Sequence, residues 1–383
     1  MKGAVLHINA NGSNPLYVCL YLKQRAIGID LDVYNFFRTT NRKRVKVIPD
    51  EIRDHFFCDV SFSQWHRIFF PLKGSITYKQ MLRTMQPTHE RYALTHAHTL
   101  FSAGYMAYRL KKEKGIPYVV AVRNTDTDTF FRLTPWFRPL GHRILHEAGA
   151  IVFISSATQE NFFRRYCSSN QKGEYERKSY VIPNGIDDLF HENQSDFKQA
   201  SISKIKVVLE VAEIRSNKNQ LSVANAIQLL RKNGEDIVYR VIGSVVEKNY
   251  YQKLMKYPFV EYIASLPHEQ LIEEYRKADL FVMPSHHETF GLVYAEALSQ
   301  NLPILYTKGQ GFDGFFENGA VGFPVDDNNE IDIAEKIKQV LDNPIDVSLY
   351  QKTIREKFSW LNIARHYEDI YEKVIFEAGR TQE

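Results

Sequence analysis

Two glutamates and a glycine lie close together in a stretch that could bind a charged ligand bearing hydroxyl groups. Glu288 and Glu296 are separated by seven residues, and Gly291 lies between them. The apolar run 280–283 ends at Pro284, which predicts a short buried strand followed by a polar loop. Helix-forming residues predominate from Leu292 onward, so this loop is expected to lead into a helix.

The order of strand, glycine-containing loop and helix directs backbone N–H groups and the positive end of a helix toward a bound anion. Because carboxylates repel phosphate, Glu288 and Glu296 are better suited to accept hydrogen bonds from hydroxyl groups beside it. An anion next to several hydroxyls is the chemistry of a sugar nucleotide. The simpler alternative is a helix with two surface glutamates.

The residues around the two glutamates resemble a known signature. Phe290-Gly291 follows the first glutamate and Ala297 follows the second. With the spacing Glu-x7-Glu, the stretch is similar to that of retaining glycosyltransferases of family 4. The resemblance implies an α/β fold of the GT-B type, in which two Rossmann-like doubly wound domains face each other across a cleft. It also implies a C-terminal helix that crosses back to the first domain.

The resemblance implies a role for each polar group of this stretch. Glu288 would bind hydroxyls of the transferred sugar and is a catalytic candidate, while Glu296 would accept hydrogen bonds from the ribose hydroxyls. Backbone N–H groups of the loop and of the helix start would hold the donor diphosphate, and they belong to Thr289, Phe290, Gly291 and Leu292.

Two cations are expected beside the diphosphate, because negative charge develops on the leaving group. Lys218 follows a predicted strand at 205–211 and matches the lysine of the family. The family arginine that precedes this lysine is replaced by Ala212 or Glu213. Arg215 is then the candidate for the second cation, and we expect both Lys218 and Arg215 to bind the donor and to be catalytic.

The first half of the chain supplies further candidates at the ends of predicted strands. Gly12 lies in the loop of a strand-helix-strand opening and resembles the first glycine-rich loop of the family, so we expect it to approach the donor. His98 follows a predicted strand that begins at Tyr92, and it resembles a histidine that lines the cleft. A strand-end histidine with a purely structural role is the alternative.

A departure from the family follows Val122. The family commonly has a histidine there that reaches the donor sugar, whereas this chain has Arg123, Asn124 and, two residues later, Asp126. We expect these three residues to contact sugar hydroxyls or phosphate in the acceptor and sugar cleft. Residues 130–143, rich in aromatic residues and proline, are expected to be irregular.

Alternating strand and helix patterns extend over the 383 residues, which predicts parallel doubly wound sheets. The expected division is an acceptor-side domain at 1–188, a nucleotide-sugar-binding domain at 204–358 and a returning helix at 359–383. The polar residues 188–203 are expected to form the linker.

The net charge of +4 is unevenly distributed. Residues 1–188 carry 27 Lys and Arg against 16 Asp and Glu, and the remainder is acidic. A basic half indicates an anionic partner. No nucleic-acid-binding motif accompanies it, so we expect contact with an anionic membrane, with basic and aromatic residues at 42–44 and 65–70 as candidates. A solvated basic face is the alternative.

The cysteines and the apolar runs of the sequence indicate the cellular compartment of the protein. Cys19, Cys58 and Cys167 show neither disulfide nor zinc spacing, which indicates a reducing environment. No secretory signal and no run of about 18 apolar residues is found. We therefore expect a cytoplasmic protein, at the inner face of the membrane where its acceptor is lipid-linked.

The resemblance implies retaining, metal-independent transfer from a UDP- or GDP-linked sugar to a saccharide or lipid-linked acceptor, in cell-surface polysaccharide or glycolipid biosynthesis. It implies no cofactor and no metal. Two alternatives remain open. One is a sugar-nucleotide epimerase or hydrolase of the same fold. The other is a non-catalytic sugar-nucleotide-binding protein, because the histidine at Arg123 and the arginine before Lys218 are missing.

Overall fold

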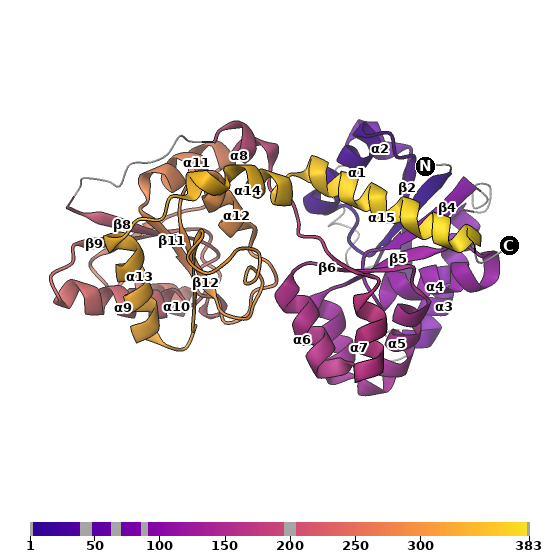
Figure 1. Ribbon diagram of the computed structural model, residues 1–383, viewed down its shortest axis with the longest axis horizontal. Helices are drawn as coiled ribbons and strands as arrows, with labels where there is room; N and C mark the ends of the chain where they lie inside the picture. Colours follow the sequence, from indigo (N-terminus) through magenta and orange to yellow (C-terminus); the bar gives the residue numbers. More distant parts are fainter. Residues whose placement is uncertain (1–2, 39–47, 63–69, 86–90, 195–203, 381–383) are drawn as a thin grey trace. The chain divides into compact units, whose positions relative to one another are not determined.

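The structure is a computed structural model that describes residues 3–38, 48–62, 70–85, 91–194 and 204–380 (Figure 1). The chain forms two compact units. Unit 1 comprises residues 1–154, 159–182 and 360–383, and unit 2 comprises residues 155–158 and 183–359. Each unit contains one parallel sheet with helices packed on it.

The sheet of unit 1 has seven strands in the order β3-β2-β1-β4-β5-β6-β7. The direction of strand order reverses between β1 and β4, so the loops that follow these two strands form the switch point at which doubly wound sheets bind ligands. The strands are β1 (Ala4–Asn9), β2 (Leu31–Arg38), β3 (Phe56–Phe62), β4 (Tyr92–Ala97), β5 (Tyr118–Val122), β6 (Ala150–Phe153) and β7 (Ser179–Val181).

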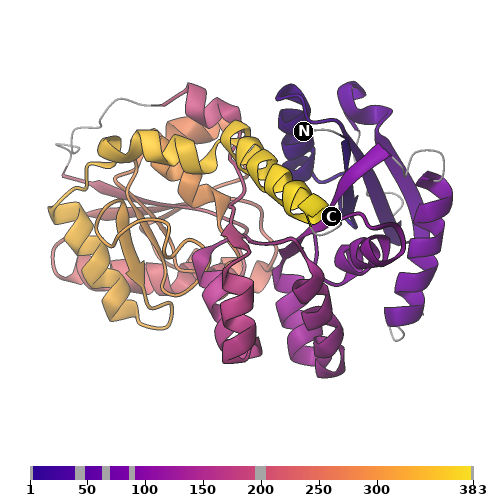
Figure 2. The same cartoon turned by 45° about the vertical axis from the view of Figure 1, so that its right-hand side comes forward.

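The last helix of the chain, α15 (Trp360–Arg380), belongs to unit 1 and packs against α1 (Pro15–Ala26), as Figures 1 and 2 show. Its apolar stripe is buried in a core shared with the sheet, and the Tyr371 hydroxyl contacts both Gln24 and His96. The expected returning helix is therefore present. The other α-helices are α2 (Asp50–Arg53), α3 (Phe70–Met85), α4 (Ser102–Lys114), α5 (Arg138–Glu147), α6 (Ser156–Tyr166) and α7 (Ser169–Glu176).

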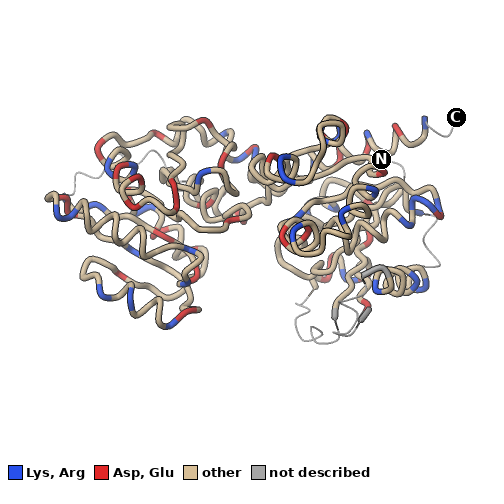
Figure 3. The backbone as a smooth tube through the Cα atoms, turned by 90° about the horizontal axis from the view of Figure 1, so that it is seen from below, with Lys and Arg blue, Asp and Glu red and all other residues tan. Residues whose placement is uncertain are grey.

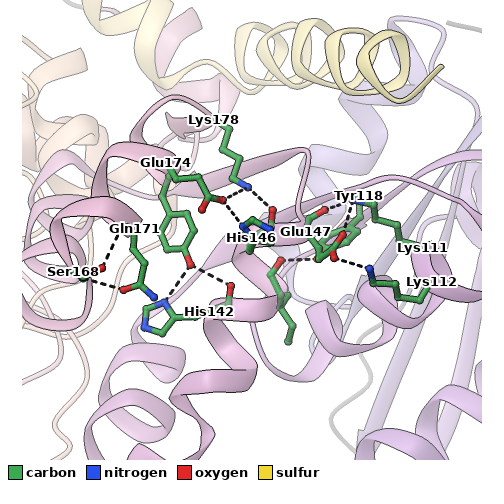
Figure 4. Close-up of polar contacts among 12 residues, drawn as sticks. Lys111, Lys112, Tyr118, His142, His146, Glu147, Ser168, Gln171, Glu174 and Lys178 are labelled. Atoms are coloured by element: carbon green, nitrogen blue, oxygen red, sulfur yellow. Dashed lines mark hydrogen bonds and ion pairs between the residues drawn. The ribbon is translucent and has the colours of Figure 1, made fainter. Parts of the chain in front are cut away.

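Only the second part of the stretch expected to be irregular, residues 138–143, belongs to a regular helix, α5. The first part contains the end of a π-helical turn η4 (Asp126–Phe131) and a short 3-10 turn η5 (Pro135–Phe137). Carbonyl groups in the last turn of a helix lack intrahelical partners. In α5 these carbonyls accept hydrogen bonds from side chains of other elements (Figure 4). The donors are Lys111, Tyr118 and Lys178, and the two lysines also complement the negative helix end.

The sheet of unit 2 has six strands in the order β10-β9-β8-β11-β12-β13, with its switch point between β8 and β11. The strands are β8 (Lys206–Val211), β9 (Ile237–Ile242), β10 (Val260–Ile263), β11 (Leu280–Met283), β12 (Ile304–Thr307) and β13 (Gly322–Val325). The helices are α8 (Asp188–Glu192), α9 (Gln220–Lys232), α10 (Lys248–Leu254), α11 (His268–Lys277), α12 (Leu292–Ser299), α13 (Glu330–Asp342) and α14 (Gln351–Phe358), with 3-10 turns η6 (Ser216–Lys218) and η7 (Val347–Tyr350).

The first residues of the expected linker are part of unit 2. Helix α8 buries Phe190, whose carbonyl accepts a hydrogen bond from the Gln300 side chain at 3.0 Å. Arg276 binds the carbonyl of Asn193 at 2.7 Å. The boundary between the units therefore falls at residues 182 and 183. Residues 195–203 of the expected linker lie outside the described residues, as do the basic residues 42–44 and residues 65–69.

Candidate functional site

The loops that follow β8 and β11 are joined at the switch point of unit 2. The backbone N–H of His286 donates to the Asn217 carbonyl at 2.9 Å, and the Asn217 side chain donates to the His287 carbonyl at 3.1 Å. Asn219 has a left-handed backbone with φ of 65° and donates to the Pro284 carbonyl at 3.1 Å. These bonds bring two segments about 70 residues apart in the sequence to one edge of the sheet.

The loop after β12 supports the same site from the other side. The Gln310 side-chain oxygen accepts the Glu288 N–H at 2.8 Å, and its NH2 group donates to the His286 carbonyl at 2.9 Å. Gly311 lies so close that an added Cβ would be 3.0 Å from the Phe290 nitrogen. Together with its φ of 25°, this close approach favours glycine at the point where the two loops meet.

Glu288 and Lys218 form an ion pair in which Nζ lies 2.7 Å from Oε2. The two side chains are largely buried, with 13% and 20% of their surfaces exposed. The second carboxylate oxygen of Glu288 accepts the backbone N–H groups of Thr289 at 3.0 Å and Phe290 at 3.4 Å. Three groups predicted to hold a diphosphate are thus bound to one carboxylate.

Gly291 and Leu292 form the start of α12. Gly291 has φ of 78°, and a Cβ there would lie 2.4 Å from the Tyr294 ring, so this position accepts only glycine without strain. The Phe290 side chain is buried against Phe312 and Phe315. Phe290 can therefore offer a ligand only its backbone, as the sequence predicts.

Glu296 lies on α12 and accepts a hydrogen bond from the Tyr275 hydroxyl at 3.0 Å. Burial raises the pKa of Glu296 to about 7, while the hydrogen bond from Tyr275 opposes this rise. A carboxylate that has little water around it gains from donors that approach its free lone pairs. Ribose hydroxyls are donors of this kind.

Among the described residues, the Arg215 side chain forms no hydrogen bond or ion pair with Lys218 or Glu288, although its backbone carbonyl accepts the Lys218 N–H at 2.9 Å. Its guanidinium lies 3.4 Å from Glu213 and its side chain is 43% exposed. The next residue, Ser216, binds Glu247 through its backbone and hydroxyl. The catalytic role of Arg215 remains a prediction.

Glu210 is a buried acid of this unit that the sequence analysis missed. It lies in β8 with no exposed surface and accepts a hydrogen bond from the Tyr239 hydroxyl at 2.5 Å. Burial raises the pKa of Glu210 to about 8, opposed by the Tyr239 bond and by the charge of Lys218. The signal in the sequence is Glu210 itself, which interrupts the apolar run 207–211.

Gly12 has a packing role in unit 1, and its expected approach to the donor remains a prediction. Its N–H donates to the Asn35 side chain at 2.8 Å. A Cβ at this position would lie 3.2 to 3.3 Å from atoms of Asn35, Val33 and Phe56. The glycine is thus explained by the close approach of β2 and β3.

His98 belongs to a buried cluster of three histidines at the switch point of unit 1. Its Nε2 lies 3.0 Å from Nδ1 of His7, and Nδ1 of His96 lies 2.6 Å from the Tyr371 hydroxyl. Ring nitrogens of all three residues lie within 4.8 Å of one another, as a metal site requires. However, the rings of His96 and His98 are stacked at 4.1 Å, so lone pairs in the ring planes do not converge. The absence of a metal remains a prediction.

Asp126 also differs from the expectation, because its carboxylate is buried and occupied. It accepts the backbone N–H groups of Leu100, Phe101 and Arg123 at 3.0 to 3.1 Å. Burial raises the pKa of Asp126 to about 6, and these hydrogen bonds oppose the rise. Asp126 therefore fixes the ends of β4 and β5 relative to each other and is not available to a sugar. Arg123 and Asn124 are partly exposed and remain candidates.

Comparison with known proteins identifies both parts of the chain. The model of Glycosyltransferase Family 4 matches residues 25–188, and that of Glycosyl transferases group 1 matches residues 192–360. A D-inositol 3-phosphate glycosyltransferase from Corynebacterium kroppenstedtii is 22% identical over 96% of this chain and 86% of its own length.

Solved structures agree on the fold. Sucrose-phosphate synthase from Thermosynechococcus elongatus has a TM-score of 0.73 at 16% identity, covering 98% of this chain and 100% of its own. HepE from Anabaena, solved with UDP-glucose, has a TM-score of 0.65 at 16% identity, covering 96% and 98% of the two chains. Within the described residues, no helix combines the length and apolar character needed to cross a bilayer.

Proposed function

We propose that this chain, which belongs to the GT-B glycosyltransferases of family 4 and group 1, moves a sugar from a nucleoside-diphosphate donor to a saccharide or lipid-linked acceptor. The observation that carries this proposal is the Lys218–Glu288 pair beside the loop N–H groups of Thr289 and Phe290. A cation, aligned N–H groups and a carboxylate supply what a sugar diphosphate needs: charge neutralisation and acceptors for hydroxyls.

When the donor binds, Lys218 and Glu288 separate and each takes a new partner. The diphosphate takes Lys218 and the loop N–H groups, and the Glu288 carboxylate moves to hydroxyls of the transferred sugar. Glu296 accepts the ribose hydroxyls from α12. The cation then stabilises the negative charge that develops as the bond between the anomeric carbon and the phosphate oxygen breaks.

We propose that the transfer retains the anomeric configuration. The acceptor oxygen approaches from the face of the leaving group, bonds to the anomeric carbon and gives its proton to the departing phosphate. The positive charges of Lys218 and of Arg215, together with the N–H groups, supply the electrostatic stabilisation, so the reaction as proposed uses no metal. Analysis of the anomeric proton in the product by NMR tests retention, and assays with and without EDTA test the metal.

The donor is identified by incubating the full chain with UDP- and GDP-linked sugars and following nucleotide release and product mass. The solved HepE complex with UDP-glucose supports the inclusion of UDP-sugars. Transfer that requires an added saccharide or lipid-linked acceptor, and that K218Q loses, supports the proposal. Epimerisation or hydrolysis without an acceptor would favour the epimerase alternative, and binding without turnover would favour a non-catalytic protein.

We propose that the chain acts in cell-surface polysaccharide or glycolipid synthesis, and that unit 1 contacts an anionic membrane that carries a lipid-linked acceptor. Helix α3 has an exposed stripe at helical spacing formed by Leu72, Ile76, Lys79 and Arg83. Leu72 is 56% and Ile76 is 38% exposed. Figure 3 shows the Lys and Arg positions along the chain. Apolar and basic residues on one helix face suit the interface of anionic lipids.

Vesicle co-sedimentation tests the membrane contact. The wild type should be recovered with vesicles containing anionic lipid and not with neutral ones. A variant with Lys79→Glu and Arg83→Glu should lose this preference. Lys253→Glu and Lys256→Glu, which change two exposed lysines of unit 2 by the same charge, serve as the matched control. Equal recovery on both vesicle types would leave a saccharide acceptor as the remaining proposal.

A further inference from the structure

Arg123 lies immediately after β5, at the carboxyl edge of the unit 1 sheet and next to its switch-point strand β4. Its side chain is partly buried, and its Nε atom is buried without a hydrogen-bond partner. Among the residues that the structure describes, no carboxylate lies within ion-pair distance of the guanidinium. The charge of Arg123 acts on the Asp126 carboxylate, but the two side chains form no ion pair. A partly buried, permanent charge without a direct ion pair is costly, so its retention calls for a binding partner.

Apart from Asp126, the side chains around Arg123 are neutral. Burial lowers the pKa of His96 and of His98 well below the usual value, and the positive charge of Arg123 lowers both further. Tyr367 of α15 lies next to the guanidinium, and burial raises its pKa to about 12 although the charge of Arg123 opposes the rise. These neighbours can therefore donate or accept hydrogen bonds, but they do not neutralise the arginine.

The nearest acid, Asp126, positions Arg123 without pairing with its side chain. Its carboxylate accepts the Arg123 backbone N–H at 3.0 Å together with those of Leu100 and Phe101. The same bonds satisfy backbone groups at the start of α4, so the carboxylate is held in place. The backbone of Arg123 is fixed. Its guanidinium forms a hydrogen bond with Tyr367 but no ion pair, so its other N–H groups can bind a ligand.

The unpaired nitrogen of His98 adds an independent observation. Its side chain has no exposed surface, its Nε2 binds His7, and its Nδ1 has no hydrogen-bond partner. The ring edge of Tyr17 lies against it, with ring centres 4.8 Å apart. Arg123, His98 and Tyr17 thus bring a cation and polar aromatic groups to the ends of adjoining strands.

We propose that Arg123 is the centre of an oxyanion subsite in unit 1 that binds a phosphate or carboxylate group carried by the acceptor. A guanidinium presents two parallel N–H groups that match either group in a bidentate manner, which a lysine does not. The assignment of this ligand to the acceptor rests on the proposed function. The presence of the anion subsite does not.

The bound anion has a consequence that a purely structural arginine would not produce. Because the Arg123 charge lowers the pKa of His96 and of His98, an anion placed on the guanidinium offsets this effect. The histidine resonances should therefore respond to the anion in a saturable way, and the response should depend on residue 123.

The test uses the full chain with isotopically labelled histidine, titrated with inorganic phosphate and separately with glucuronate. In the wild type, the resonances of the buried cluster should shift with one saturation curve. R123Q should weaken the apparent affinity by about tenfold or more, and R123K by less. R132Q removes an exposed arginine of the same segment and should match the wild type. Thermal unfolding of each variant checks that it is folded.

The outcomes separate this inference from the proposed function. If the wild type and R123Q bind phosphate and glucuronate equally, the subsite is overturned. The same holds if K218Q loses this binding while R123Q keeps it. Arg123-dependent binding without transfer to any acceptor would uphold the subsite and contradict the proposed function. Where transfer is observed, a comparison of acceptors that carry a phosphate, a carboxylate or neither group identifies the source of the anion. The wild type should prefer the charged acceptor, and R123Q should lose this preference. An equal preference in R123Q would overturn the inference.

Discussion

The Nζ atom of Lys218 lies 2.7 Å from Oε2 of Glu288, so the residue expected to hold the donor diphosphate is paired with the residue expected to hold the donor sugar. The other oxygen of Glu288 accepts the N–H groups of Thr289 and Phe290. The carboxylate thus occupies the partners of an anion. A donor must replace it, and the released carboxylate then becomes available to sugar hydroxyls.

The first prediction concerns Glu288→Gln. Removing the carboxylate charge frees Lys218 from a competitor, so UDP should bind more tightly, by roughly threefold to tenfold if the partly buried pair contributes about 1 kcal/mol. Transfer should nevertheless fall by about 10²-fold or more, because the sugar loses its charged acceptor. Calorimetry with UDP and initial rates measure the two effects.

The matched control for this prediction is K218Q, which should weaken UDP binding and also slow transfer. Weaker UDP binding by E288Q than by the wild type would show that Glu288 does not compete with the diphosphate.

A second prediction concerns Glu296, whose pKa burial raises to about 7. Because hydroxyl donors favour the ionised carboxylate, the affinity for UDP-glucose, or for the donor identified by assay, should rise from pH 6 to pH 8. Glu296→Gln should abolish this dependence, and Glu296→Ala should cost roughly 1–3 kcal/mol of binding at pH 8. The same slope in wild type and E296Q would remove Glu296 from the ribose site.

Glu210 gives a third prediction, for stability. Its folded pKa is raised to about 8, so the folded state keeps a proton that the unfolded chain loses above its ordinary value of 4.5. Its contribution to the free energy of unfolding therefore falls as pH rises from 4.5 to 8, by up to about 1.4 kcal/mol per pH unit. Glu210→Gln should be more stable than the wild type at pH 8 and lose this advantage near pH 4.5. Urea denaturation of the wild type and of Glu210→Gln at pH 4.5 and pH 8 tests this prediction. An equal difference in the free energy of unfolding at both pH values would contradict it.

A fourth prediction concerns the buried histidine cluster, whose contribution to stability should fall as the pH decreases. Burial lowers the pKa of His7 to about 3, so below pH 6.5 the unfolded chain binds a proton that the folded state excludes. Stability should therefore fall as pH decreases from 6.5, by up to about 1.4 kcal/mol per pH unit for each such histidine. His7→Gln should show a shallower fall than the wild type between pH 6.5 and 4.5. Parallel curves would mean that His7 is not protonated on unfolding.

Local patterns predicted the elements of the unit 2 site. The apolar runs before Lys218 and Glu288 became β8 and β11, and the helix former Leu292 begins α12. The pairing of the two residues did not follow from sequence, because it depends on a strand order that places β8 beside β11 and on the side chains of Asn217, Asn219 and Gln310.

Other features of the structure could not be predicted for the same physical reason. Nothing near Gly12 in the sequence indicated that Asn35 of the next strand would take its N–H. Asp126 looked like a ligand because its carboxylate follows a strand, yet the chain uses it to join two loops. Helix α5 extends beyond the stretch expected to be irregular, and its last turn is held by Lys111 and Lys178, which are far away in sequence.

The most direct test of the account is a crystal structure of the full chain with its intact donor, identified by the transfer assay. The account predicts that Lys218 Nζ and the N–H groups of Thr289 and Phe290 contact the diphosphate, and that the Glu288 carboxylate has moved to hydroxyls of the sugar. A donor bound in unit 2 with the 2.7 Å contact between Lys218 and Glu288 still in place would contradict it.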